Sequence, residues 1–105
     1  MKKTETIVSI GLPVYNGDQT LSIVLDALLA QTFTNFEIII SDNCSTDNTE
    51  KICKTYAFND KRIRYIKQSV NLGIFGNLEF VLSKAVGRYF MWSAADDLRS
   101  KDFLE

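Results

Sequence analysis

The residues best suited to chemistry are three aspartates that follow apolar segments of the chain. Asp96 and Asp97 stand side by side shortly after the apolar run 89–92, and Asp42 follows a second run at residues 36–40. Adjacent carboxylates repel each other and resist burial, and a divalent cation such as Mg²⁺ or Mn²⁺ is the commonest group to offset that cost. If both runs are buried strands of an open α/β sheet, their carboxyl ends lie at the edge where ligands bind. The three acids therefore predict a site for a metal ion and a phosphorylated ligand; the alternative is an exposed acidic turn that caps a C-terminal helix.

The loop after the first predicted strand offers an aromatic side chain. Pro13 is expected to end that strand, because proline cannot donate to a sheet ladder, and Asn16-Gly17 signals a turn. Tyr15 then lies at the sheet edge, where its ring could stack on a base. A plain strand-to-helix turn with a surface tyrosine is the alternative.

The polar loop 42–48 combines ligand-binding and helix-capping residue types. Asp42 precedes the next helix by several residues, which favours hydrogen bonds to a base N–H or a ribose hydroxyl. Ser45, Thr46 and Asp47 are helix-starting types, and Asp47 followed by Glu50 resembles a capping box. The alternative is that the whole stretch is a cap and nothing else.

The segment from Asn71 to Asn77 carries two glycines and two asparagines before a predicted helix. Backbone N–H groups at a helix start attract phosphate, so diphosphate contact and simple loop geometry are equal alternatives here. The segment lacks the Gly-Lys-Ser/Thr ending of a P-loop. Asn77 is expected to cap the helix start, and Gly87 to form a left-handed cap at its end.

Composition limits the classes of function. A chain of 105 residues forms one domain, and a net charge of −1 argues against nucleic-acid binding through phosphate contacts. The absence of histidine excludes a Ser-His-Asp triad and removes the usual general base. No apolar run approaches the roughly 20 residues of a membrane span. Cys44 and Cys53 fit no metal or redox spacing, so we expect two reduced thiols and a cytoplasmic protein.

Strand-like and helix-like patterns alternate along the chain. Apolar runs predict strands at residues 7–12, 36–41, 63–66 and 88–93. Apolar residues recur at helical spacing at 21–29, 52–57 and 78–85, and residues 102–105 begin another helix. Asp18 or Thr20 could cap the first helix. This order predicts a Rossmann-like α/β fold, with a mostly parallel four-stranded sheet and helices on both faces.

Taken together, these segments resemble the family 2 glycosyltransferases of the GT-A fold. The resemblance covers nearly all of the chain and rests on the order and spacing of residues 8–16, 29–33, 36–47, 71–73 and 87–97. It implies that residues 1–105 are the amino-terminal, nucleotide-sugar-binding part of a GT-A domain whose acceptor-binding half is absent. Members transfer a sugar from a nucleotide diphosphate sugar to an acceptor hydroxyl, generally with inversion.

The resemblance also implies roles for individual residues. Pro13, Val14 and Tyr15 would border the base, and Asp42 would bond the base with Asn43 nearby. Asp96 would approach the ribose or the metal, and Asp97 would coordinate Mg²⁺ or Mn²⁺ through the diphosphate. Two departures are Ala94, where the family often has an acid, and Asn43, where an aspartate is common.

The resemblance places the catalytic base in the second half, so we expect no catalytic residue within this chain and little turnover by it alone. The expected acceptor is a glycan or a lipid-linked glycan of cell-wall or polysaccharide biosynthesis, with peripheral membrane contact in the full-length form. Apolar surface near the last strand would favour self-association. Two other classes stay open: a nonenzymatic nucleotide-binding or scaffold module, and a phosphoacceptor signalling domain, which would need acids after the first strand.

Overall fold

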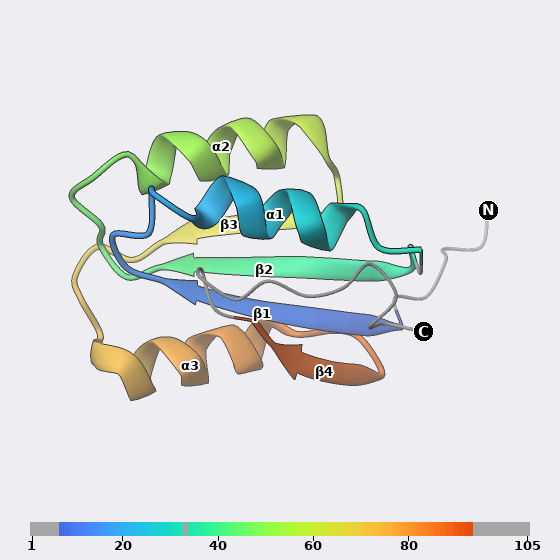
Figure 1. Ribbon diagram of the computed structural model, residues 1–105. Coiled ribbons are helices and arrows are strands. Elements are labelled where there is room, and N and C mark those ends of the chain that lie inside the picture. Colours follow the sequence, from blue (N-terminus) through green and yellow to red (C-terminus); the bar gives the residue numbers. More distant parts are fainter. Residues whose placement is uncertain (1–6, 33, 94–105) are drawn as a thin grey trace.

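The computed structural model describes residues 7–32 and 34–93, which form one parallel sheet with helices on both faces (Figure 1). The elements in chain order are β1 (Val8–Val14), α1 (Leu21–Leu29), β2 (Phe36–Asp42), α2 (Thr49–Asn59), β3 (Ile63–Lys67), α3 (Gly73–Lys84) and β4 (Tyr89–Trp92). The four strands are all parallel in the order β3-β2-β1-β4. Helices α1 and α2 cover one face and α3 covers the other (Figure 1). The predicted fold class is confirmed, whereas the helix predicted at 102–105 lies outside the described residues.

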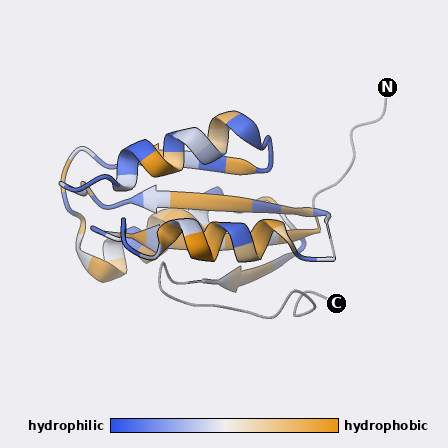
Figure 2. Ribbon diagram, turned by 45° about the horizontal axis from the view of Figure 1, so that its top comes forward, coloured by the Kyte–Doolittle hydropathy of each residue, from blue (hydrophilic) through white to orange (hydrophobic). Residues whose placement is uncertain are grey.

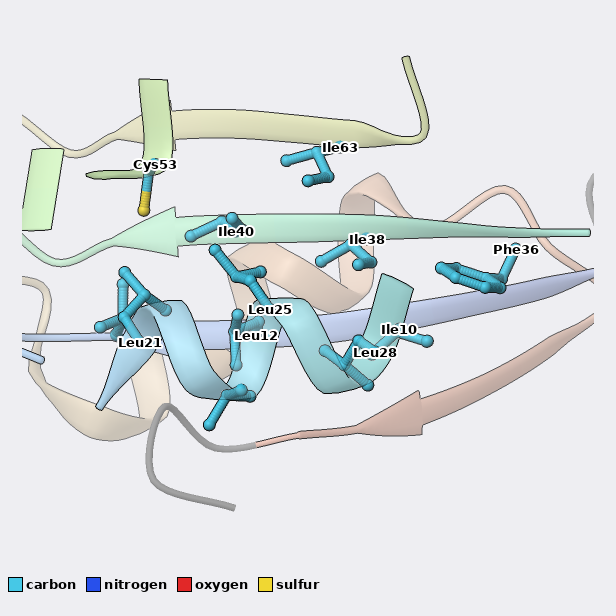
Figure 3. Close-up of a cluster of buried hydrophobic side chains, with 12 residues drawn as sticks. Ile10, Leu12, Leu21, Leu25, Leu28, Phe36, Ile38, Ile40, Cys53 and Ile63 are labelled. Atoms are coloured by element: carbon cyan, nitrogen blue, oxygen red, sulfur yellow. The ribbon is translucent and has the colours of Figure 1, made fainter. Parts of the chain in front are cut away.

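The core lies between the sheet and the pair α1 and α2. Every residue of β2 is buried, as its run of isoleucines predicts for a strand covered on both faces. Hydrophobic colours dominate β2 in Figure 2, whereas the helices mix both kinds of residue. Figure 3 shows the side chains of α1 that meet the strands; the buried members of this helix are Leu21, Val24, Leu25 and Leu28. None of the described helices has the length and apolar character needed to cross a membrane.

Strand β1 continues through Pro13, so the prediction that proline ends this strand is wrong. Pro13 pairs in register with Ser41, and Val14 with Asp42. The carbonyl of Gly11 accepts from the N–H of Ser93. Because the backbone groups of successive strand residues point to opposite sides, Pro13, two residues later, also directs its backbone toward the side of β4. Pairing with β4 ends at Gly11. The missing N–H of Pro13 therefore leaves no ladder bond unmade within the described sheet.

Strand β4 is less buried than its apolar sequence predicts. Tyr89 is 64% exposed and Trp92 40% exposed. Within the described sheet this strand lies at an edge and pairs with β1 alone, and this position explains the exposure. The prediction of a buried strand at residues 89–92 is therefore wrong for the described structure.

Helix α3 begins five residues earlier than its apolar pattern predicts, at Gly73 instead of residue 78. Asn77 therefore lies inside the helix and does not cap it. Gly87 has no positive φ, so the predicted left-handed cap is also wrong. A Cβ atom at Gly87 would lie 2.7 Å from the backbone nitrogen of Ser9. Glycine is needed here for the close approach of the α3–β4 connection to β1.

Candidate functional site

The carboxyl ends of β1, β2 and β3 bring three polar loops to one edge of the sheet (Figure 1). These loops cover residues 15–20, 43–48 and 68–72. Because β4 runs parallel to the other strands, its carboxyl end points to the same edge. The acids predicted to bind ribose and metal, Asp96 and Asp97, lie outside the described residues, as does Ala94.

The loops after β1 and β2 are joined by hydrogen bonds between backbone and side chain. The N–H of Asn16 donates to Ser45 Oγ at 2.8 Å, and Asn16 Oδ1 accepts from the N–H of Thr46 at 2.8 Å. Asn16 adopts a positive φ of 50°, which asparagine tolerates well. Ser45 and Thr46 therefore fix the turn after Tyr15, and the alternative in which the whole loop is only a helix cap is wrong. The tyrosine side chain is 53% exposed beside this turn.

Helix α2 is capped from both loops. Asp47 Oδ1 accepts from the N–H of Thr49 at 2.9 Å, which confirms that Asp47 stabilises the helix start. Asp18 caps this helix rather than α1, because its carboxylate accepts from the N–H of Asn48 at 3.2 Å. Thr20 is the N-cap of α1 without a side-chain capping bond. Glu50 pairs with Lys54 and Lys67, so the reciprocal bond of a capping box is not made.

The carboxylate of Asp42 is held entirely by the protein. The residue is fully buried; Oδ1 accepts from the N–H of Ser45 at 2.9 Å, and Oδ2 accepts from the Tyr65 hydroxyl at 2.7 Å. Burial, together with the hydrogen bond to Asp42, raises the pKa of Tyr65, so this hydroxyl stays protonated and donates. These contacts hold the β2–α2 loop in place. A direct bond from Asp42 to a ligand stays a prediction.

A hollow of about 170 Å³ opens at the carboxyl end of β1, between β1 and the first turns of α3. Five of the predicted donor-binding residues line this hollow: Pro13, Val14, Tyr15, Asn43 and Asn77. The other wall is formed by Ile74, which the predicted helix left out because it began at residue 78, and by Leu78, which was assigned only to the apolar face of that helix. Among the residues that the structure describes, the lining consists of apolar side chains, a tyrosine and two amides, with no charged group. The hollow therefore suits a flat, uncharged ring that carries hydrogen-bonding groups.

The three predicted asparagines connect α3 to the end of β2. Asn43 Nδ2 donates to Asn71 Oδ1 at 3.0 Å, and Asn43 Oδ1 accepts from the N–H of Leu72 at 2.7 Å. Asn77 Nδ2 donates to the backbone carbonyl of Ser41 at 3.0 Å, and Asn77 Oδ1 accepts from the Ser41 hydroxyl at 2.5 Å. The side-chain amides of Asn43 and Asn77 therefore connect the first turns of α3, which form the wall of the hollow, to the end of β2.

A second hollow on the described surface is larger than the one at the end of β1 but is lined by different elements. The groove between α1 and α2, which includes Ser22 and Lys51, has a volume of about 400 Å³. Its lining comes from α1, α2 and Asn48 of the β2–α2 loop and includes no strand residue. In open α/β sheets, ligands bind outside the carboxyl ends of the strands, which favours the smaller hollow.

The acids and cysteines of the described residues do not gather into a metal site. Within residues 7–32 and 34–93, no three His, Cys, Asp or Glu side chains are grouped so that they could hold a metal ion. Cys44 and Cys53 are both free thiols, as their spacing predicts. The predicted metal ligands therefore remain the adjacent carboxylates of Asp96 and Asp97.

Comparison with known proteins decides the family. Residues 9–105 match the family described as Glycosyl transferase family 2. The chain belongs to this family. Its similarity to the putative glycosyltransferase EpsE of Bacillus subtilis is 36% identity over 92 residues, which cover 87% of this chain. The Escherichia coli enzyme WfgD, named a UDP-Glc:alpha-D-GlcNAc-diphosphoundecaprenol beta-1,3-glucosyltransferase, is 33% identical over 99 residues, or 94% of this chain.

Solved glycosyltransferase structures share the same arrangement of strands and helices. The crystal structure of S. aureus TarS 1-349 in complex with UDP-GlcNAc matches with a TM-score of 0.87 and 27% identity, over 93% of this chain and 29% of that one. A complex of the same protein with UDP matches with a TM-score of 0.86. The GT-A assignment is confirmed by these matches. This family 2 chain spans only 33% of the length of EpsE and 38% of WfgD.

Proposed function

We propose that this chain supplies the donor site of a glycosyltransferase that transfers a sugar from a nucleotide diphosphate sugar to an acceptor hydroxyl, with inversion. The observation that carries the proposal is the hollow at the carboxyl end of β1, whose described lining is uncharged, in a chain of glycosyl transferase family 2. TarS, whose matching structures contain UDP and UDP-GlcNAc, supports a nucleotide sugar as the ligand.

In this proposal the base enters the hollow and stacks on Tyr15, with Pro13 and Val14 at its border. Base–aromatic stacking contributes about 1–3 kcal/mol per base, and half of the Tyr15 surface is open for it. Asn43 and Asn77 lie in the wall, where their side-chain amides bond to the protein and fix the shape of the hollow. Asp42 acts on the site indirectly in this proposal, because its carboxylate accepts the hydrogen bonds that hold the loop carrying Asn43. Asn71 lies at the start of α3, where a diphosphate would find backbone N–H groups.

A divalent cation fits the chemistry of the acids at 96 and 97. Mg²⁺ and Mn²⁺ prefer oxygen ligands and are commonly held by one or two carboxylates together with substrate phosphates. When bound, the metal would stabilise negative charge on the departing diphosphate. Asp97 would hold it, with Asp96 beside the metal or the ribose.

The rest of the reaction is proposed to depend on residues outside this chain. The relatives are more than twice as long, and residues 1–105 contain no group that we assign as catalytic base. We propose a glycan or lipid-linked glycan as acceptor, and the name of WfgD, with a diphosphoundecaprenol acceptor, supports the second kind. The proposed location is the cytoplasm, with peripheral membrane contact in the longer protein.

The test measures binding of UDP and GDP to the 105-residue chain by isothermal titration calorimetry. Tyr15→Ala should weaken binding by on the order of tenfold through lost stacking. Phe58→Ala is the matched control, because Phe58 is an aromatic residue that is 91% exposed on α2. Equal loss in both variants, or no binding of either nucleotide, would contradict the proposal.

The metal is tested in the same assay. Mn²⁺ should strengthen nucleotide binding, and Asp97→Ala should abolish that gain while leaving metal-free binding in place. Equal affinity in Mn²⁺ and in EDTA would count against the metal role.

A further inference from the structure

We propose that Asn43 is a positioning residue, which ties the start of α3 to the end of β2 and thereby fixes one wall of the hollow. Asn43 is 5% exposed, and its backbone N–H donates to the Val14 carbonyl at 2.8 Å, so its main chain belongs to the sheet edge. Its side chain reaches residues 71–73. Nδ2 donates to Asn71 Oδ1 at 3.0 Å and to the Gly73 carbonyl at 3.3 Å, while Oδ1 accepts from the Leu72 N–H at 2.7 Å.

The three groups around this side chain require an amide. The Leu72 N–H can only donate and the Gly73 carbonyl can only accept, so the Asn43 amide fits in one orientation. An aspartate at this position would place a carboxylate oxygen, which can only accept, opposite two other acceptors, Asn71 Oδ1 and the Gly73 carbonyl. Asn71 cannot relieve this conflict by turning its amide, because its Oδ1 also accepts from the Gly73 N–H at 2.8 Å. The tie therefore depends on the asparagine at position 43.

The tie acts where α3 forms the hollow. Gly73 adopts a φ of 78°, so the chain turns sharply into the helix directly after the tied residues. Ile74 and Leu78 form the wall of the hollow. Asn77, one helical turn after Gly73, makes a second connection to β2 through the Ser41 carbonyl. For nucleotide binding, the inference rests on the proposed function: loosening the tie should shift this wall and weaken binding.

The test compares Asn43→Asp with Asn48→Asp, which makes the same chemical change at an exposed residue before α2. The first readout is amide hydrogen exchange at Gly73, measured by NMR. The N–H groups in the first turn of a helix have no intrahelical acceptor, so protection of Gly73 reports its bond to Asn71. Asn43→Asp should speed this exchange on the order of tenfold, because Asn71 must turn away or lose its partner. The same variant should weaken UDP binding, and Asn48→Asp should change neither quantity.

Unchanged exchange at Gly73 in a folded Asn43→Asp protein would overturn the inference. If that variant does not fold, Asn71→Ala tests the same tie from an exposed position. This change leaves the acceptor of the Leu72 N–H in place but loosens Asn43, so exchange at Leu72 should become faster, and unchanged exchange there would also overturn the inference. A wild-type chain that binds neither UDP nor GDP would contradict the proposed function, and the exchange rates would still decide on the tie.

Discussion

Replacing Asp42 with alanine separates a structural role of this carboxylate from a ligand-binding role. The change leaves two donors without their acceptor, the buried N–H of Ser45 and the hydroxyl of Tyr65. An unsatisfied buried donor costs about 1–3 kcal/mol, and the partly exposed hydroxyl, which can turn to water, costs about 0.5–1.5 kcal/mol. We therefore expect the free energy of unfolding to fall by about 2–4 kcal/mol. This is a large part of the 5–15 kcal/mol typical of small domains.

Urea denaturation followed by tryptophan fluorescence measures this loss. With a slope of about 2 kcal/mol per molar urea, the middle of the usual range for small proteins, the midpoint should fall by roughly 1–2 M. Tyr65→Phe is the matched control, because it removes one donor and keeps the bond from Ser45; its expected loss is about 1 kcal/mol. The reasoning would be refuted by an Asp42→Ala protein that unfolds at the wild-type midpoint and no longer binds nucleotide, since Asp42 would then act on the ligand alone.

Three further predictions concern the helix cap, the thiols and the apolar edge. Burial alone would raise the pKa of Asp47, but hydrogen bonds from Thr49 and Asp18 outweigh it and lower this pKa. Asp47→Ala should therefore cost about 0.5–2 kcal/mol at pH 7, and the difference from wild type in urea should vanish as the pH falls below the lowered pKa. A thiol reagent should label Cys44 in the native protein and Cys53 only in urea, because burial raises the pKa of Cys53 to about 12; rapid labelling of both would contradict the burial. The exposed aromatic edge of β4 should make the chain self-associate, and sedimentation showing a strict monomer at high concentration would contradict this.

Local patterns sufficed for the layers of the fold. The isoleucines of β2 predicted a strand buried on both faces, and the spacing of Leu21, Leu25 and Leu28 predicted the buried side of α1. Both signals depend on residues close in sequence. They therefore identify the elements, and the right-handed crossover rule supplies the parallel order.

The errors concern residues whose partners are distant in the sequence. Asn77 is a good capping type, but it bonds to Ser41, 36 residues away, and so occupies the helix interior. Pro13 fits inside β1 because the pairing of β1 with β4 ends at Gly11, and the sequence around Pro13 does not reveal where this pairing ends. The ligand-binding role of Asp42 stays a prediction, but the sequence did not reveal the bond that its carboxylate accepts from the Tyr65 hydroxyl, 23 residues away on β3. Such long-range hydrogen bonds are visible only once the chain is folded.

The central claim is that the hollow at the carboxyl end of β1 receives the base of a nucleotide. An NMR titration of the ¹⁵N-labelled chain with UDP, and with GDP in parallel, tests it most directly. The account predicts that the signals that shift will be the backbone of Tyr15 and the side-chain amides of Asn43 and Asn77. Shifts confined to the groove between α1 and α2, around Lys51 and Tyr56, would place the ligand on the helices and contradict the account.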